Sequence, residues 1–337
     1  MVGVMFKKTC YLLLLFQFSF LVHADLNELL SQLPFSQQDR QKILQGELVQ
    51  TSTTATEDRE LAVLLAFIVK TTPDVFRKNF ISGSLINLPE AIITSHQLTD
   101  KTTLNDLATL SFSGKDDDEI AKFLSAKAGD DLNLSANEIK QFRSLNPIEK
   151  GSGEAQKAVE KQLHKLFLER YHAYKSGGVK AIAPYQRKNG EKFFLGEYFK
   201  KTSTQDLPII EKEFPIYFHA LNAYPHNKPA QLDESFFALK MNVQGSTIFS
   251  LMHRMILEEE GRFAMMVRQY YASGSFNGEQ DIGVAIPVKD GVLIIGLFRS
   301  SSDQVAGFGS GFKRSVGESL FFHSLDHYFE KIQKLRK

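Results

Sequence analysis

The chain has 337 residues, with 40 Lys and Arg against 39 Asp and Glu, and Cys10 is its single cysteine. This balanced charge provides no electrostatic attraction to nucleic acid or to an anionic membrane surface, so we expect neither as a partner. The length is sufficient for two domains that each have their own hydrophobic core.

The first 24 residues are predicted to be a signal peptide. Lys7 and Lys8 form a positively charged n-region, and an apolar h-region runs from Cys10 to Val22. The small residue Ala24 is typical of the position before a signal peptidase cleavage site. We expect cleavage after Ala24 and a periplasmic or secreted protein; the alternative is an uncleaved anchor. The mature chain would contain no cysteine and no transmembrane segment, which favours a bacterial exported protein without disulfides or thiolate metal sites.

Residues 25–150 are predicted to form a helical domain. The segment from Glu57 to Lys70, EDRELAVLLAFIVK, is apolar around much of a helical circumference, so we predict a buried core helix there. Ser135 and Glu138 have the spacing of a capping box, which predicts the start of another helix.

Residues 151–337 are predicted to form an α+β domain that begins at a Gly151-Ser152-Gly153 hinge. After a long amphipathic helix, the apolar period changes to two, which predicts an antiparallel sheet over 232–299. A stripe of apolar residues predicts a C-terminal helix over 312–335 that lies on this sheet. This order resembles helix-grip (START-like) folds, in which a curved sheet holds a long C-terminal helix and a lipid binds between them.

Several motifs resemble a family of exported proteobacterial proteins that has no assigned activity. They are Arg268-Gln-Tyr-Tyr-Ala-Ser-Gly-Ser-Phe-Asn277, Ile286-Pro-Val-x-x-Gly291, Arg299-Ser-Ser-Ser-Asp-Gln-Val-Ala-Gly-Phe-Gly-Ser310, Gly178-Val-Lys-Ala-Ile-Ala-Pro-Tyr185 and the Leu-Ser-x-x-Glu-Ile stretch that ends at Ile139. The resemblance implies export but no mechanism. Family members often carry a Cys-x4-Cys pair before the Leu-Ser stretch, where this chain has Ala126 and Asp131, so a disulfide there is not expected.

The candidate site lies around the segment from Gly291 to Gly317, where an apolar strand leads through a glycine-rich loop to a basic helix start. Free backbone amides at such a loop bind anions, and a guanidinium suits a carboxylate or phosphate. A meander places Arg268 two strands from Arg299 on the same sheet. The alternative is that these arginines form structural ion pairs, with Asp303 as the nearest partner for Arg299. The predicted ligand-binding residues are Arg268, Tyr270, Asn277, Arg299, Asp303, Gly309 and Lys313.

The leading hypothesis is a non-enzymatic envelope protein that binds a lipid-like or anionic amphiphile. No cofactor is expected, and no metal site either, because the acidic runs do not fit the EF-hand pattern. One alternative is a hydrolase that uses Ser or His near residues 299–315, with Ser310 as a candidate nucleophile, although no Gly-x-Ser-x-Gly motif is present. The other is an interaction protein without a pocket.

Overall fold

A computed structural model describes residues 26–81, 91–129, 131–145, 151–204, 208–306 and 314–319, together with Phe322, His323, Asp326, Phe329 and Glu330. The predicted signal peptide and the glycine-rich loop at 307–313 therefore lie outside the described residues. Within the described part, no helix combines the length and the apolar character that a membrane crossing requires.

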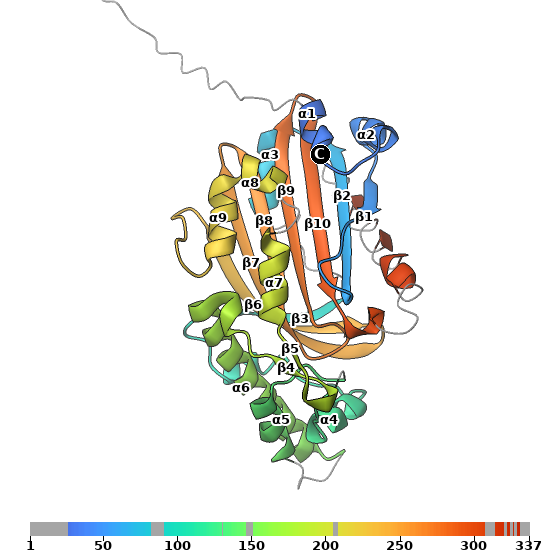
Figure 1. Ribbon diagram of the computed structural model, residues 1–337. Coiled ribbons are helices and arrows are strands. Elements are labelled where there is room, and N and C mark those ends of the chain that lie inside the picture. Colours follow the sequence, from blue (N-terminus) through green and yellow to red (C-terminus); the bar gives the residue numbers. More distant parts are fainter. Residues whose placement is uncertain are drawn as a thin grey trace, which may run out of the picture.

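One eight-stranded antiparallel sheet forms the centre of the molecule (Figure 1), in the order β1-β2-β10-β9-β8-β7-β6-β3. The strands are β1 (Val49–Ser52), β2 (Glu60–Val69), β3 (Ile92–Leu98), β6 (Asp233–Val243), β7 (Ser246–Glu259), β8 (Arg262–Ala272), β9 (Gly278–Val288) and β10 (Gly291–Ser301). The fold class is therefore α+β, as predicted. A second, two-stranded sheet pairs β4 (Tyr185–Gln186) with β5 (Lys192–Phe193).

Strands β6 to β10 form the antiparallel meander that the sequence predicts. Gln244-Gly245 and Glu260-Gly261 make two of its turns, and all four residues have positive φ, as two-residue turns of a twisted hairpin require. The two-residue turns fix the register of β6 with β7, of β7 with β8 up to the bulge at Tyr270, and of β9 with β10.

The helices are α1 (Leu26–Ser31), α2 (Gln37–Leu44), α3 (Pro73–Ile81), α4 (Asp117–Leu124), α5 (Ala136–Arg143), α6 (Gly153–Gly177), α7 (Leu195–Thr204), α8 (Pro208–Glu213) and α9 (Pro215–Ala223). Helices α7, α8 and α9 cover one face of the sheet, α6 lies at its lower end with α4 and α5, and α3 lies on the opposite face (Figure 1). The predicted capping box at Ser135 and Glu138 is present at the start of α5.

The helix predicted over Glu57 to Lys70 is wrong, because this segment forms β2. Nine of its ten residues are fully buried, since β2 lies between β1 and β10 with both faces covered. A strand that is buried on both faces has a continuous apolar run, and periodicity alone does not distinguish such a run from a buried helix.

The region before residue 150 is not purely helical, contrary to the prediction. The single sheet takes β1, β2 and β3 from the region that was expected to be helical, and β2 pairs along its whole length with β10. The Gly151-Ser152-Gly153 segment therefore does not separate a helical part from a sheet-containing part; it precedes α6, with Ser152 as the N-cap.

The two faces of the sheet carry different layers. The face under α6, α7 and α9 forms the larger hydrophobic core, while Val63, Leu65 and Phe67 of β2 belong to a core on the other face. Phe322 and Phe329, from the predicted C-terminal helix, pack against that second core, and the Phe329 ring meets Phe67 edge-on at 4.9 Å between centroids.

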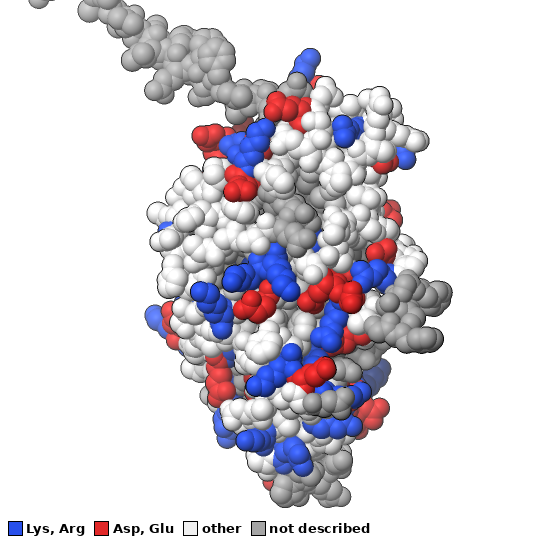
Figure 2. All heavy atoms as spheres, viewed as in Figure 1, with Lys and Arg blue, Asp and Glu red and all other residues white. Residues whose placement is uncertain are grey.

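Charged side chains of both signs are interspersed on the surface in Figure 2, and neither sign forms a continuous field on this face. This distribution agrees with the near-neutral composition.

Candidate functional site

A row of polar side chains crosses the middle of the sheet on the face under the helices. Cross-strand pairing places Arg299, Gln280, Arg268 and His253 side by side, between the apolar residues Ala62 of β2 and Phe236 of β6. Arg299 and Arg268 thus lie two strands apart on the same face, as the meander predicts. Both guanidinium side chains are about 1 % exposed, so their charges are taken out of water.

Arg299 has a carboxylate partner within the protein. Its Nη1 donates to Glu60 Oε1 at 3.0 Å and to the Thr54 carbonyl at 3.2 Å, and Glu60 is completely buried. The Tyr198 hydroxyl of α7 donates to the same carboxylate oxygen at 3.1 Å, and the Thr56 amide binds the other oxygen. This geometry neutralises the guanidinium, so Arg299 is half of a structural ion pair.

Arg268 has a different environment. Its Nε donates to Gln280 Oε1 at 2.7 Å, its Nη1 to the Tyr174 hydroxyl at 2.9 Å and its Nη2 to Ser203 Oγ at 3.1 Å. The Phe199 ring covers the guanidinium at 5.1 Å. All three hydrogen-bond partners are neutral, and no carboxylate of the described residues forms an ion pair with Arg268.

Among the described residues, the groups that contact Arg268 do not balance its positive charge. Glu234, which lies 3.6 Å from the neighbouring His253, is paired with Lys228 at 2.6 Å. Burial raises the pKa of Tyr174 and raises that of Tyr217 well above its usual value, so both hydroxyls are neutral at pH 7. The last turn of α7, next to Ser203, supplies a helix dipole of about half a negative charge, which offsets only part of the guanidinium charge.

The other two buried arginines of the described chain resemble Arg299 and not Arg268. Arg170 forms a bidentate pair with Glu138, with N–O distances of 2.8 and 2.7 Å. Arg187 forms an ion pair with Asp303, with 2.9 Å between Arg187 Nη2 and Asp303 Oδ2. Arg268 is therefore the one fully buried arginine, among the residues that the structure describes, whose partners are all neutral.

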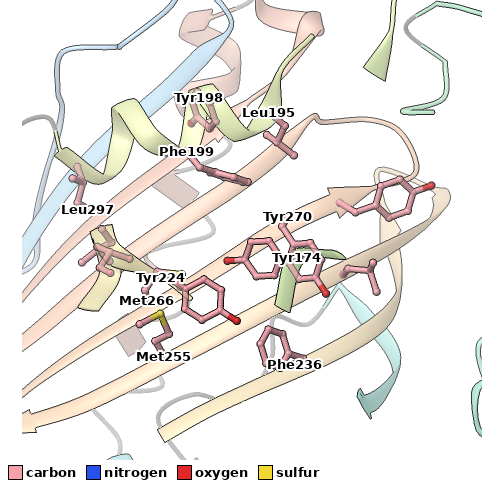
Figure 3. Close-up of a cluster of buried hydrophobic side chains, with 14 of the residues drawn as sticks. Tyr174, Leu195, Tyr198, Phe199, Tyr224, Phe236, Met255, Met266, Tyr270 and Leu297 are labelled. Carbon is pink, nitrogen blue, oxygen red and sulfur yellow. The ribbon is translucent and has the colours of Figure 1, made fainter. Parts of the chain in front are cut away.

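Aromatic rings gather around Tyr174, one of the hydrogen-bond partners of Arg268 (Figure 3). The Tyr270 ring stacks on Tyr174 with 4.0 Å between centroids and an angle of 9°, and the Tyr224 ring stacks on Tyr174 with 5.5 Å between centroids. A bulge in β8 places both Tyr270 and Tyr271 in the helix-covered core. The Tyr217 and Tyr270 hydroxyls and His253 Nε2 are buried without a hydrogen-bond partner, although His253 Nε2 lies 3.6 Å from Glu234 Oε1, so the two hydroxyls each have a hydrogen available to donate.

The remaining predicted site residues fall elsewhere. Asn277 and Asp303 meet at Arg187: the Asn277 Oδ1 accepts from Arg187 at 2.7 Å, and Asp303 pairs with Arg59 and Arg187 instead of Arg299. Together they line an open polar pocket of about 220 Å³. The interpretation of Asp303 as the partner of Arg299 is therefore wrong, because β2 brings Glu60 closer. Gly309 and Lys313 lie outside the described residues.

The serines next to Arg299 have structural partners. Ser301 donates to Glu57 Oε1 at 3.1 Å, and Ser302 donates to the Ser275 carbonyl at 3.1 Å while it caps the short turn of 3₁₀ helix at Asp303–Val305. Neither serine hydroxyl is hydrogen-bonded to a histidine. Ser310 lies outside the described residues.

Sequence reasoning missed Glu60, Gln280 and the Tyr174 hydroxyl as parts of this row. One signal for Gln280 was available: the two-residue turn at Lys289-Asp290 fixes a register in which Gln280 lies opposite Arg299. Glu60 could not be recognised as a partner while its segment was interpreted as a helix.

The described residues thus form an α+β protein in which helices cover an antiparallel sheet and bury a guanidinium whose described partners are all neutral. Comparison with family models, with curated proteins and with solved structures finds no match for the chain.

Proposed function

We propose that this protein is an exported, non-enzymatic binding protein for a small anion or anionic amphiphile, whose oxyanion head pairs with Arg268. The observation that carries the proposal is the contrast among the four buried arginines, of which Arg268 has only neutral partners. A buried charge is strongly unfavourable without a partner of opposite charge, and a ligand carboxylate, sulfonate or phosphate provides one.

The chemistry around Arg268 suits an acceptor ligand. The Tyr217 and Tyr270 hydroxyls are buried and have no hydrogen-bond partner, and burial raises the pKa of each well above its usual value, so each keeps a proton that it can donate. An oxyanion accepts several hydrogen bonds at once, so it satisfies donors that the protein's own acceptors do not reach.

Most side chains near the row are apolar, a chemistry that would favour the tail of an amphiphile. Phe199, Tyr270, Met255 and Met266 belong to the helix-covered core near the row (Figure 3). Arg299 is not part of this proposed site, because Glu60 already neutralises it and Gln280 lies between the two arginines. The proposed site lies under α6, α7 and α9, on the face opposite to the one where Phe322 and Phe329 pack, and so differs from the predicted site between the sheet and the C-terminal helix.

Native mass spectrometry of gently purified protein tests the proposal. We expect an anionic small molecule to remain with the wild-type protein, because a ligand at a 1 % exposed guanidinium is enclosed. Arg268→Met should lose it. Arg77→Met is the matched control, since it removes the same charge from an exposed pair with Glu258, and it should retain the ligand.

A thermal shift assay with two defined probes distinguishes the contribution of the oxyanion head group to binding from that of the apolar tail. Methanesulfonate presents the oxyanion alone, whereas octanesulfonate adds a chain that gains about 0.8 kcal/mol per buried CH₂ group. We expect octanesulfonate to raise the melting temperature of wild type and Arg77→Met but not of Arg268→Met. Equal effects of the two sulfonates would indicate a small anion without a tail. The proposal fails if no anion is retained and neither probe distinguishes Arg268→Met from wild type.

A further inference from the structure

We propose that anion binding at Arg268 takes up one proton from solvent, through a chain of hydrogen bonds formed by Tyr174, His253 and Glu234. This inference rests on the function proposed above and specifies how the same site is regulated. This chain of hydrogen bonds has two arrangements in which every bond has one donor and one acceptor. The two arrangements differ by one bound proton.

The first arrangement follows from which atoms carry a hydrogen that they can donate. Arg268 Nη1 carries hydrogen only, so at 2.9 Å it donates to the Tyr174 oxygen. The Tyr174 hydroxyl then directs its own proton to His253 Nδ1 at 3.0 Å. His253 therefore accepts at Nδ1 and carries its hydrogen on Nε2, which lies 3.6 Å from Glu234 Oε1.

His253 is neutral in this arrangement. Burial lowers its pKa well below the usual value, and the positive charges of Arg268 on β8 and Lys228 lower it further. The other titratable groups that face it are Tyr174 from α6, Tyr224, whose ring centroid is 4.7 Å away, and Glu234 from β6.

The second arrangement forms when an oxyanion pairs with Arg268. The anion is an acceptor next to the Tyr174 hydroxyl, so the tyrosine proton turns from His253 to the anion. His253 Nδ1 then needs a hydrogen of its own to keep its bond to the Tyr174 oxygen. Moving the Nε2 hydrogen to Nδ1 would leave a lone pair facing the Glu234 carboxylate, which is unfavourable.

Addition of a proton avoids that repulsion. The imidazolium donates from Nδ1 to the Tyr174 oxygen and from Nε2 toward Glu234, while Arg268 still donates to Tyr174. The anion also neutralises Arg268, one of the charges that keep His253 neutral. Glu234, whose side chain is 14 % exposed, connects the chain to solvent, which supplies the proton.

Linkage gives the sign of the pH dependence. A ligand whose binding takes up a proton binds more tightly as pH falls, by at most tenfold in Kd per pH unit. The dependence disappears above the His253 pKa of the bound form, where no proton is taken up.

Isothermal titration calorimetry with octanesulfonate between pH 5.5 and 8.5 tests this inference, since a sulfonate does not titrate in that range. Titrations in two buffers that differ in ionisation enthalpy measure the protons taken up. We expect uptake that approaches one proton per anion at low pH, and a Kd that rises with pH. His219→Gln, an exposed histidine on α9, is the matched control and should behave as wild type.

Two variants keep the inference falsifiable. His253→Gln should bind octanesulfonate with no proton uptake. If this variant does not fold, Glu234→Gln serves instead: it removes the carboxylate that opposes the tautomer shift, so uptake should fall by at least half. Binding in wild type that is independent of pH, with no uptake, overturns the inference and leaves the proposed function intact. Absence of binding at every pH overturns both.

Discussion

The two arginines of the polar row occupy similar positions and have opposite surroundings. Arg299 and Arg268 are equally buried, lie on the same face and both neighbour Gln280. Arg299 is held by the Glu60 carboxylate, whereas Arg268 is held by an amide and two hydroxyls. The comparison indicates that burial of an arginine does not by itself define a role. The charge of its partners separates a structural ion pair from a candidate ligand site.

The energetic consequences differ in the same way. A buried ion pair is weak evidence for net stabilisation, but removal of one member is costly because it leaves an unpaired charge behind. Removal of an arginine that has only neutral partners leaves no such charge. Substitutions at the two positions therefore have different expected effects on stability and on ligand binding.

Arg299→Met is expected to have the largest effect, a loss of about 3–5 kcal/mol in the free energy of unfolding, because it leaves Glu60 buried without a cation. Urea denaturation measures this loss. The control Arg77→Met removes an arginine whose side chain is 54 % exposed, and it should cost less than about 1 kcal/mol. A similar small cost for Arg299→Met would contradict the ion-pair interpretation.

Arg268→Met should cost only about 1–2 kcal/mol in protein freed of ligand. The substitution removes an uncompensated charge, and the acceptors it leaves are neutral groups of which Gln280 and Ser203 also bond to each other. The same urea denaturation measures it beside Arg299→Met. Equal losses at the two positions would remove the contrast, and Arg268 would then be a structural residue as well.

The pH dependence of the free energy of unfolding is expected to show a smaller effect. Because the His253 pKa is lowered in the folded state, the unfolded chain binds the proton more readily, and stability is lost as pH falls below about 6.5. The loss is at most about 1.4 kcal/mol per pH unit. His253→Gln should reduce this dependence, measured by urea denaturation at pH 7.5 and 5.5.

The comparison with His253→Gln is needed because other groups act in the opposite direction. Burial raises the pKa of Glu279 and raises that of Asp281 well above its usual value, so both carboxyls contribute stability that is lost as pH rises. The difference between wild type and variant isolates the imidazole. A difference of zero would show that His253 does not titrate differently on unfolding.

The sequence was sufficient for the parts of the fold that local patterns determine. The capping box at Ser135 and the two-residue turns of the meander depend on neighbouring residues, and the structure confirms both. The strand β2 was missed because its continuous apolar run depends on β1 and β10, which come from distant parts of the chain. Tertiary context decides the conformation of such a segment.

The candidate site was predictable to a similar extent. The register of the meander places Arg268 and Arg299 on one face of the sheet, and the spacing of the residues in the sequence was enough to predict this. Their partners come from elements far away in sequence, such as Glu60 from β2 and Tyr174 from α6. The difference in charge between the two surroundings therefore becomes visible only in three dimensions.

The smallest expected effect is that of Tyr270→Phe, and the other tyrosine of the stacked pair beside Arg268, Tyr174, provides the comparison. Tyr174→Phe should cost about 1–3 kcal/mol, because its hydroxyl accepts from Arg268 and donates to His253, and both groups would lose a buried partner. Tyr270→Phe should change the free energy of unfolding by less than about 0.5 kcal/mol, because its hydroxyl has no partner within the protein. The two rings stack on each other at 4.0 Å and both substitutions preserve the stack, so the difference in urea denaturation reports the hydroxyls alone. If Tyr270→Phe were as costly as Tyr174→Phe, the Tyr270 hydroxyl would have a structural partner. The excess of buried donors on which the anion proposal depends would then be smaller by one.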